Sequence, residues 1–282
     1  MAIQWFPGHM TKALRMMEEN AKIVDAVGYV LDARAPLACF NPSFTKIVGN
    51  KPCVFILNKC DLADPNKVSA WCNYFRSRGN AFVKVTATAS AEASKITMAF
   101  DEATAQIRAK NQQKGVFKPV RCLVLGVPNC GKSTLINCLS GRKTTVTGDK
   151  PGVTKGKQWV RLKSGLELLD TPGTLWPKFD DEKTAYELCF IGSIKDDVVD
   201  IMDVSLKLLS TLCELYPQNL TERYKVDIQP AAEMFEDIAK KRGFLLRGGE
   251  IDDERCAKAI LDDFRKAKIG KITFDTPEII EK

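Results

Sequence analysis

The sequence predicts an α/β fold, a mostly parallel sheet with helices on both faces, followed by a small helical domain. Apolar residues recur at helical spacing over residues 10–24 and 96–107. Strands that alternate with such helices favour a parallel sheet covered on both sides. A Lys-Ser-Gly turn at 163–165 predicts a hairpin between the last two strands in the chain. The short apolar runs predicted as strands are residues 27–32, 53–57, 82–85, 122–125, 159–162 and 166–169.

The strand pattern fades after residue 178, where helical spacing takes over at 198–215 and 257–264. We therefore expect two domains, an α/β domain over residues 1–178 and a helical C-terminal domain over residues 179–282. The polar and basic segment 108–119 is expected to be a connector.

The composition is that of an ordinary globular protein, because 45% of the 282 residues are hydrophobic and 27% are charged. No apolar run reaches the roughly 18 residues that cross a bilayer, so we expect no membrane partner. The first residues resemble neither a secretory signal nor a transit peptide, which predicts a cytoplasmic protein. The ten cysteines include no C-x-x-C pair and there is one histidine, so no zinc site is predicted.

Charge is unevenly distributed along the chain. Residues 1–180 carry 26 Lys and Arg against 13 Asp and Glu, whereas residues 181–282 carry 16 against 22. A basic half of this size suits a polyanionic partner such as RNA. A solvated, Lys-rich surface explains the charge equally well.

A glycine-rich loop at residues 126–133 predicts a phosphate-binding site, because it fits G-x-x-x-x-G-K-[ST] in full. A predicted strand precedes the loop and a predicted helix follows it, the context in which backbone N–H groups and a helix N-terminus face phosphates. Lys132 is expected to bridge β- and γ-phosphate oxygens, and the Ser133 hydroxyl to bind Mg²⁺. The loop residues expected to contact the nucleotide are Asn129, Cys130, Gly131, Lys132, Ser133 and Thr134.

Two further segments are expected near the γ-phosphate and its metal ion. Asp170 ends a predicted strand and begins the sequence Asp-Thr-Pro-Gly, so it is expected in the Mg²⁺ shell. Gly173 would let its backbone N–H approach the γ-phosphate. In the Gly- and Pro-rich loop at 148–154, Thr154 is expected to bind the same Mg²⁺ when the γ-phosphate is present, with an ordinary surface threonine as the alternative.

The tetrapeptide Asn-Lys-Cys-Asp, which closes the predicted strand at 53–57, predicts recognition of guanine. The Asp61 carboxylate can accept hydrogen bonds from guanine N1–H and from the exocyclic amine, an arrangement of donors that adenine lacks. Asn58 is expected on the N7 side of the base and the Lys59 stem over its ring. Thr86 and Ala87 are expected to add base contacts. The predicted ligands are therefore GTP and GDP.

These motifs stand in an unusual order, because the guanine motif precedes the phosphate loop and Asp-Thr-Pro-Gly comes last. Joining the usual termini and opening new ones after residue 173 gives the same sheet, since termini lie at the surface. The segment after Gly173 then runs directly into the helical domain. We expect the nucleotide state to set the placement of that domain.

Five further segments, together with this permuted order, are typical of one family: Trp5-Phe6-Pro7-Gly8-His9-Met10, Asp32-Ala33-Arg34-Ala35-Pro36, Trp176-Pro177-Lys178-Phe179, Lys241-Arg242-Gly243 and Gly248-Gly249. On these segments the chain resembles the ribosome-biogenesis GTPase A family nearly from end to end. The resemblance implies a circularly permuted P-loop GTPase that acts late in assembly of the large ribosomal subunit, with that subunit as partner. A regulatory switch and an RNA-modification GTPase are the alternatives, and we expect the protein to be monomeric.

Hydrolysis needs help from residues outside the usual pattern, because Thr174 and Leu175 stand where many GTPases carry a water-orienting Gln. Resemblance to other GTPases implies that Asn129 helps to bind K⁺, while a residue chosen only for the turn is the alternative. His9 is a second candidate, for a catalytic or water-orienting role or for docking. The predicted catalytic residues are thus His9, Lys132 and Thr154.

The C-terminal tail places basic residues and glycines together within an acidic region, at 240–242 and 247–249. Cations and backbone N–H groups of this kind can bind RNA phosphates. From charge alone, a solvated surface explains these residues nearly as well as RNA binding does. The family resemblance favours RNA binding.

Overall fold

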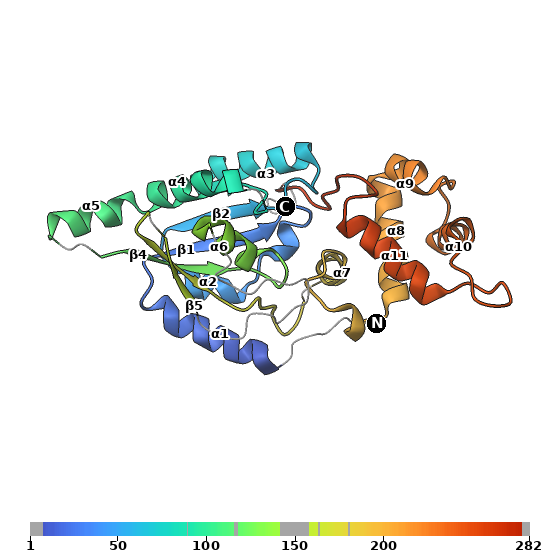
Figure 1. The fold of residues 1–282 in the computed structure, drawn as a ribbon, viewed down its shortest axis with the longest axis horizontal. Helices are drawn as coiled ribbons and strands as arrows, with labels where there is room; N and C mark the ends of the chain where they lie inside the picture. Colours follow the sequence, from blue (N-terminus) through green and yellow to red (C-terminus); the bar gives the residue numbers. More distant parts are fainter. Residues whose placement is uncertain are drawn as a thin grey trace.

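A single mixed sheet forms the centre of the first part of the fold. The computed structural model describes residues 8–88, 90–115, 118–141, 158–162, 164–179 and 181–277. Within these residues, six strands pair in the order β3-β2-β1-β4-β6-β5 (Figure 1). They are β1 (Ala26–Asp32), β2 (Cys53–Asn58), β3 (Ala81–Lys84), β4 (Val120–Leu125), β5 (Gln158–Arg161) and β6 (Leu166–Asp170).

All neighbouring strands run parallel except β5, which pairs antiparallel with β6. Every residue of the central strand β1 is buried, as expected for a parallel strand covered on both faces. The six predicted strands are confirmed, each within two residues at its ends. The predicted hairpin is confirmed as well, since Leu162 N donates to Leu166 O at 2.8 Å.

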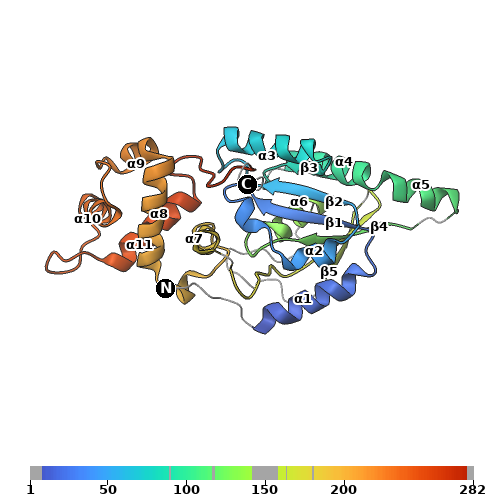
Figure 2. The same cartoon turned by 180° about the vertical axis from the view of Figure 1, so that it is seen from behind.

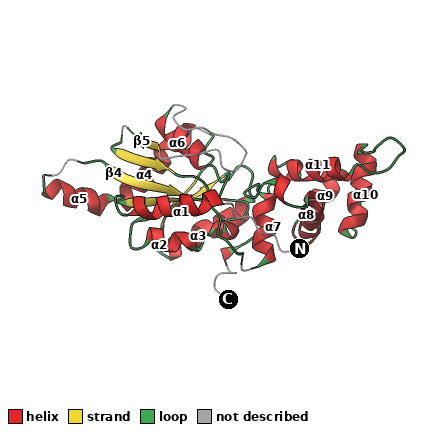
Figure 3. Cartoon of the chain, turned by 90° about the horizontal axis from the view of Figure 1, so that it is seen from below, coloured by secondary structure: helices red, strands yellow, loops and turns green. Residues whose placement is uncertain are grey.

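Helices cover both faces of this sheet, as the alternating pattern predicted. In Figure 3 the sheet lies between α6 on one side and α2 and α3 on the other. Segment 108–119, predicted as a connector, is helical as far as Gln113. The helices of this part are α1 (Gly8–Ala21), η1 (Leu37–Cys39), α2 (Ser43–Val48), α3 (Pro65–Ser77), η2 (Ser90–Glu92), α4 (Ala93–Ala103), α5 (Ala105–Gln113) and α6 (Lys132–Ser140).

From α7 to α11 the described chain is mostly helical and forms the other end of the molecule (Figure 2). Helix α8 lies at its centre and contacts α7, α9, α10 and α11. None of the described helices is both long and apolar enough to cross a membrane. The elements are α7 (Glu182–Phe190), η3 (Asp196–Val198), α8 (Ile201–Leu215), α9 (Pro217–Tyr224), α10 (Ala231–Arg242) and α11 (Asp253–Arg265).

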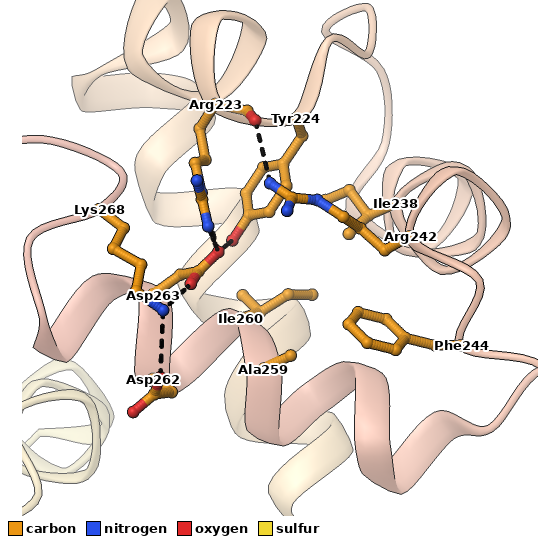
Figure 4. A pocket seen from close by; sticks show the side chains of 10 residues that line it. All are labelled: Arg223, Tyr224, Ile238, Arg242, Phe244, Ala259, Ile260, Asp262, Asp263 and Lys268. Atoms are coloured by element: carbon orange, nitrogen blue, oxygen red, sulfur yellow. Dashed lines mark hydrogen bonds and ion pairs between the residues drawn. The ribbon is translucent and has the colours of Figure 1, made fainter.

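A largely buried ion pair joins α9 to α11 inside this helical part. Arg223 Nη2 lies 2.7 Å from Asp263 Oδ2, and Asp263 is only 7% exposed. Tyr224 and Lys268 direct their polar atoms to the same carboxylate (Figure 4). The Asp263 carboxylate is thus held by three residues of the helical part.

The C-terminal segment does not stay with the helices but returns to the sheet. Ile272 N donates to Leu62 O at 3.2 Å, and Phe274 N donates to Arg34 O at 2.8 Å. Figure 1 shows the described chain beyond α11 running from the helical part back toward the sheet. The predicted domain boundary after residue 178 stays a prediction, with segment 271–277 packed on the part that precedes it.

Two buried carboxyl groups meet where α7 and this returning segment pack together. Asp275 accepts from Trp71 Nε1 and from Leu37 N, both at 3.0 Å. Burial raises the pKa of Asp275 to about 7, partly offset by these hydrogen bonds. Burial also raises the pKa of Glu187 to about 8, helped by the charge of Asp275 and opposed by Lys183. Glu187 Oε1 is buried without a hydrogen-bond partner among the described residues.

Replacing Glu187 by Gln should stabilise the protein at pH 8 by about 1–3 kcal/mol and have little effect at pH 5. The carboxyl has a pKa near 4.5 when unfolded and about 8 when folded. Its contribution to stability is therefore fully present below pH 4.5 and is lost as the pH rises to about 8. Urea denaturation at both pH values measures this, with Glu182→Gln on the exposed face of the same helix as control. A pH dependence unchanged in Glu187→Gln would contradict the expectation.

Candidate functional site

The predicted phosphate loop connects the end of β4 to the start of α6, at the edge of the sheet where the parallel strands end. Its turns use a left-handed backbone at Asn129 and Gly131, with φ of 57° and 100°. A Cβ on Gly131 would lie 2.2 Å from Asn58 Nδ2, so only glycine fits there. A tight loop that leads directly into a helix is an arrangement that binds phosphate groups.

Lys132 begins α6 and folds back over this loop. Its Nζ donates to the carbonyl oxygens of Gly126 and Val127, at 3.0 and 2.9 Å, and the residue is only 6% exposed. The ammonium group is thus held at the centre of the loop. A phosphate oxygen can replace these carbonyl oxygens as its partner, so the position fits the predicted contact to the nucleotide.

The residues predicted to hold Mg²⁺ lie together. Ser133 Oγ donates to Asp170 Oδ2 at 2.9 Å, while Asp170 Oδ1 is buried without a hydrogen-bond partner in the described structure. Burial raises the pKa of Asp170, and the Ser133 hydrogen bond and the charge of Lys132 offset this only in part. A cation beside the carboxylate would favour its charged form, so this donor set fits Mg²⁺. Thr154, the third predicted ligand, lies outside the described residues.

Gly173 brings the Asp-Thr-Pro-Gly segment against the phosphate loop. A Cβ at this position would lie 2.5 Å from Pro128 Cα and 2.9 Å from Lys132 Nζ. Upstream, Thr171 Oγ1 donates to Val124 O at 2.6 Å, which ties the segment to β4. The backbone at Gly173 therefore lies as close to the phosphate loop as the predicted γ-phosphate contact requires.

Asn58 and Lys59 join the guanine motif to the phosphate loop. Asn58 Nδ2 donates to Cys130 O at 2.9 Å, and Asn58 Oδ1 accepts from Ala87 N at the same distance. Lys59 Nζ donates to Asn129 O at 2.6 Å. The Asn58 amide thus braces two loops, and its predicted contact to the base stays a prediction.

Asp61 lies exposed beside the loop that follows β3, where Thr86 Oγ1 donates to its Oδ1 at 3.1 Å. The structure therefore brings together Asp61, Thr86 and Ala87, the residues predicted to surround the base. An exposed carboxylate keeps acceptor capacity for the two guanine donors.

Asn129 and Pro128 also contact the helical part of the chain. Asn129 Nδ2 donates to Gly192 O at 2.8 Å, and Ser193 Oγ donates to Pro128 O at 2.7 Å. The sequence did not predict this contact. The predicted role of Asn129 in K⁺ binding stays a prediction, and it would use the amide oxygen, since the amide nitrogen binds Gly192.

Three predicted site residues remain, and only Cys130 and Thr134 lie in the phosphate loop or on the helix that follows it. Cys130 is buried inside the loop and Thr134 is half-buried on the first turn of α6. His9 is exposed on the first turn of α1 and makes no hydrogen bond or ion pair within the described chain. Its catalytic or docking role stays a prediction.

A buried ion pair behind the guanine motif was missed as a functional element. Asp32, at the end of β1, accepts from Arg34 Nε at 2.9 Å and Arg34 Nη2 at 2.7 Å, and both residues are at most 2% exposed. The same carboxylate lies 2.9 Å from Lys59 Nζ. The signal in the sequence is an acid at the end of an apolar strand, and it entered the prediction only through the resemblance of residues 32–36 to the family.

Comparison with known proteins agrees with this geometry. The model of a family described as 50S ribosome-binding GTPase matches residues 121–238. A protein named ribosome biogenesis GTPase A from Priestia megaterium is 41% identical over 286 residues, which cover 100% of this chain and 99% of that protein.

Two solved structures have the same fold over most of the chain. The GDP-bound structure of TM YlqF matches with a TM-score of 0.68 at 26% identity, covering 94% of this chain and 100% of that one. GNP-bound YlqF from T. maritima matches with a TM-score of 0.65 at 27% identity, covering 95% and 99%. With its permuted sheet and its phosphate and guanine motifs, the chain is a GTPase that belongs to the ribosome biogenesis GTPase A family.

Proposed function

We propose that this protein binds the maturing large ribosomal subunit while it holds GTP, hydrolyses GTP once docked, and leaves in its GDP form. The relatives' names support a role in ribosome biogenesis, and the matching family is described by 50S ribosome binding. The excess of Lys and Arg in residues 1–180 suits an RNA-rich partner. We further propose that it acts as a monomer in the cytoplasm.

The contact between the phosphate loop and the helical part is the observation that best supports a nucleotide-dependent release. Gly192 and Ser193 follow α7 and bind Asn129 and Pro128 through hydrogen bonds of 2.8 and 2.7 Å. Arg265 on α11 donates to Cys189 O and Phe190 O at the end of α7. A change in the loop on loss of the γ-phosphate would therefore reach α11 through two sets of hydrogen bonds.

The residues at the γ-phosphate can divide the work of hydrolysis between them. Mg²⁺ held by Ser133 and Asp170 would neutralise charge on the phosphate oxygens. Lys132 would stabilise the same charge from the phosphate loop, and Gly173 would donate its backbone N–H to the γ-phosphate. We propose Thr154 as a further Mg²⁺ ligand, Asn129 as a K⁺ ligand, and His9 as a residue that acts only after docking.

GTP turnover with and without purified large ribosomal subunits, in potassium buffer, tests the proposal. We expect at least about tenfold stimulation, because small GTPases that lack a completed site turn over at only about 10⁻⁴–10⁻² s⁻¹. Small subunits and sodium buffer are the controls. If the protein binds GTP tightly but neither large subunits nor their precursors stimulate turnover, the proposed partner is wrong. The protein would then be a GTPase that acts with a different partner.

The variant Ser193→Ala separates the partner response from basal chemistry. It removes the hydrogen bond to Pro128 O but no group predicted to touch the nucleotide. Basal turnover should stay within about twofold, while stimulation by large subunits should fall several-fold, in line with the loss of one hydrogen bond. Ser210→Ala on α8 is the matched control for loss of a hydroxyl in the helical part.

A further inference from the structure

Lys59 is held at its charged end by two oxygen atoms from different elements. Its Nζ lies 2.9 Å from Asp32 Oδ2, which belongs to β1, and 2.6 Å from Asn129 O in the phosphate loop. The backbone of Lys59 has a φ of 61°, which is uncommon for a residue with a side chain. Anchors at both ends therefore define the path of the lysine stem.

Asp32 is suited to be the fixed anchor. The residue is 0% exposed, and Arg34 holds its carboxylate through Nε and Nη2 in a two-point contact. Burial alone raises the pKa of Asp32, but the charges of Arg34 and Lys59 outweigh it, so the pKa lies well below its usual value. Asp32 is thus a buried carboxylate that Arg34 holds at two points and that stays charged near neutral pH.

We propose that Asp32, oriented by Arg34, is a positioning residue that holds the Lys59 stem where it packs over the guanine ring. This inference rests on the proposed recognition of guanine by residues 58–61. It does not depend on the proposed ribosomal partner. Asp32 acts through Lys59 and does not touch the nucleotide. Its loss therefore weakens the binding of GTP and GDP alike and leaves turnover at saturating GTP nearly unchanged.

Arg34 extends this anchor to the helical part of the chain. Its Nη1 donates to Arg265 O at 3.3 Å, and its guanidinium lies 5.3 Å from the centre of the Phe264 ring on α11. Its own carbonyl oxygen accepts from Phe274 N at 2.8 Å. The guanine motif is thereby braced from behind by α11 and by the returning C-terminal segment.

The first experiment compares nucleotide affinity and turnover in the full-length Asp32→Asn variant. Asparagine keeps the shape of the side chain but removes the charge that holds Lys59. We expect the Kd for both GTP and GDP to rise about tenfold, with kcat changed less than twofold. Equal affinity to the parent protein, or a fall in kcat alone, would overturn the proposal.

A double-mutant cycle with Lys59→Met separates positioning from general stability. If Asp32 acts through Lys59, Asp32→Asn should add less than about twofold to the Kd of Lys59→Met, whereas independent effects would multiply. Asp263→Asn is the matched control, because it removes the charge of the buried partner of Arg223 in the helical part. It should lower the Tm and leave the Kd for GTP unchanged.

Two further variants keep the test decisive. If Asp32→Asn does not fold, Lys59→Arg and Lys59→Met are compared instead. Lys59→Arg keeps a cation for Asp32 and should therefore bind GTP more tightly than Lys59→Met. Equal losses of GTP affinity in the two variants would contradict the role of Asp32. Asp61→Asn tests the guanine assignment on its own. An altered base preference in Asp61→Asn together with an unchanged Kd in Asp32→Asn would overturn the positioning role alone.

Discussion

Replacing Gly173 by Ala is expected to reduce kcat/KM for GTP by at least about 100-fold, because misplacement of groups by about 1 Å has effects of this size. A Cβ at this position would lie 2.5 Å from Pro128 Cα and 2.6 Å from Pro128 N. Both are backbone atoms of the phosphate loop and cannot turn away as a flexible side chain would. One of the two segments must move.

The same methyl group would lie 2.9 Å from Lys132 Nζ. The displacement would therefore affect the lysine and the backbone that are proposed to contact the γ-phosphate. GDP has no γ-phosphate, so its affinity should fall less than that of a non-hydrolysable GTP analogue. Titration of both nucleotides and single-turnover hydrolysis measure the two effects separately.

Gly79→Ala is the control for this variant. Gly79 follows α3 with a φ of 67° and has no atom within 4 Å of the position of a Cβ. Alanine there should cost about 1 kcal/mol in stability through backbone strain and leave turnover unchanged. Full activity in Gly173→Ala would show that the segment after Asp170 does not approach the nucleotide.

The sheet and the site motifs were predictable because their signals are local. Strand β1 is an unbroken apolar run, and parallel strands buried on both faces require such runs. Asp32, Asn58 and Asp170 each end a strand, so a parallel sheet brings them to one edge. The sequence thus predicted that Asn58 and Asp170 lie at this edge, but it gave Asp32 no role there and did not predict the bond from Asn58 to Cys130 O.

Contacts between distant segments left no such signal. Ser193 has the same appearance in sequence as any loop serine, and its bond to Pro128 O depends on how α7 packs. Asp275 lies in the segment predicted to belong to the helical domain, yet it accepts from Trp71 on α3. Both contacts result from tertiary packing, which the spacing of apolar residues along one element does not encode.

Replacing Asp61 by Asn is expected to change the preferred base from guanine to xanthine. The carboxylate is proposed to accept from guanine N1–H and from the exocyclic amine, and Asn retains only one acceptor and introduces a donor. Affinity for GTP should fall by about 10²–10⁴-fold. The reason is that the NH₂ group of the asparagine is a donor and would face a donor of guanine, so that neither group has an acceptor. Xanthosine triphosphate, which has a carbonyl oxygen in place of the amine, should bind more tightly than GTP.

The control Thr86→Val removes the hydroxyl that donates to Asp61 Oδ1 at 3.1 Å. It should weaken GTP by only a few-fold and keep the preference for guanine, because the carboxylate that reads the base remains. Competition of labelled GDP with GTP, ITP, XTP and ATP gives all four affinities in one assay. An unchanged order of affinities in Asp61→Asn would show that another group reads the base. If Asp61 does read it, GTP and GDP must weaken by the same factor, because they share the base and differ only at the phosphate loop.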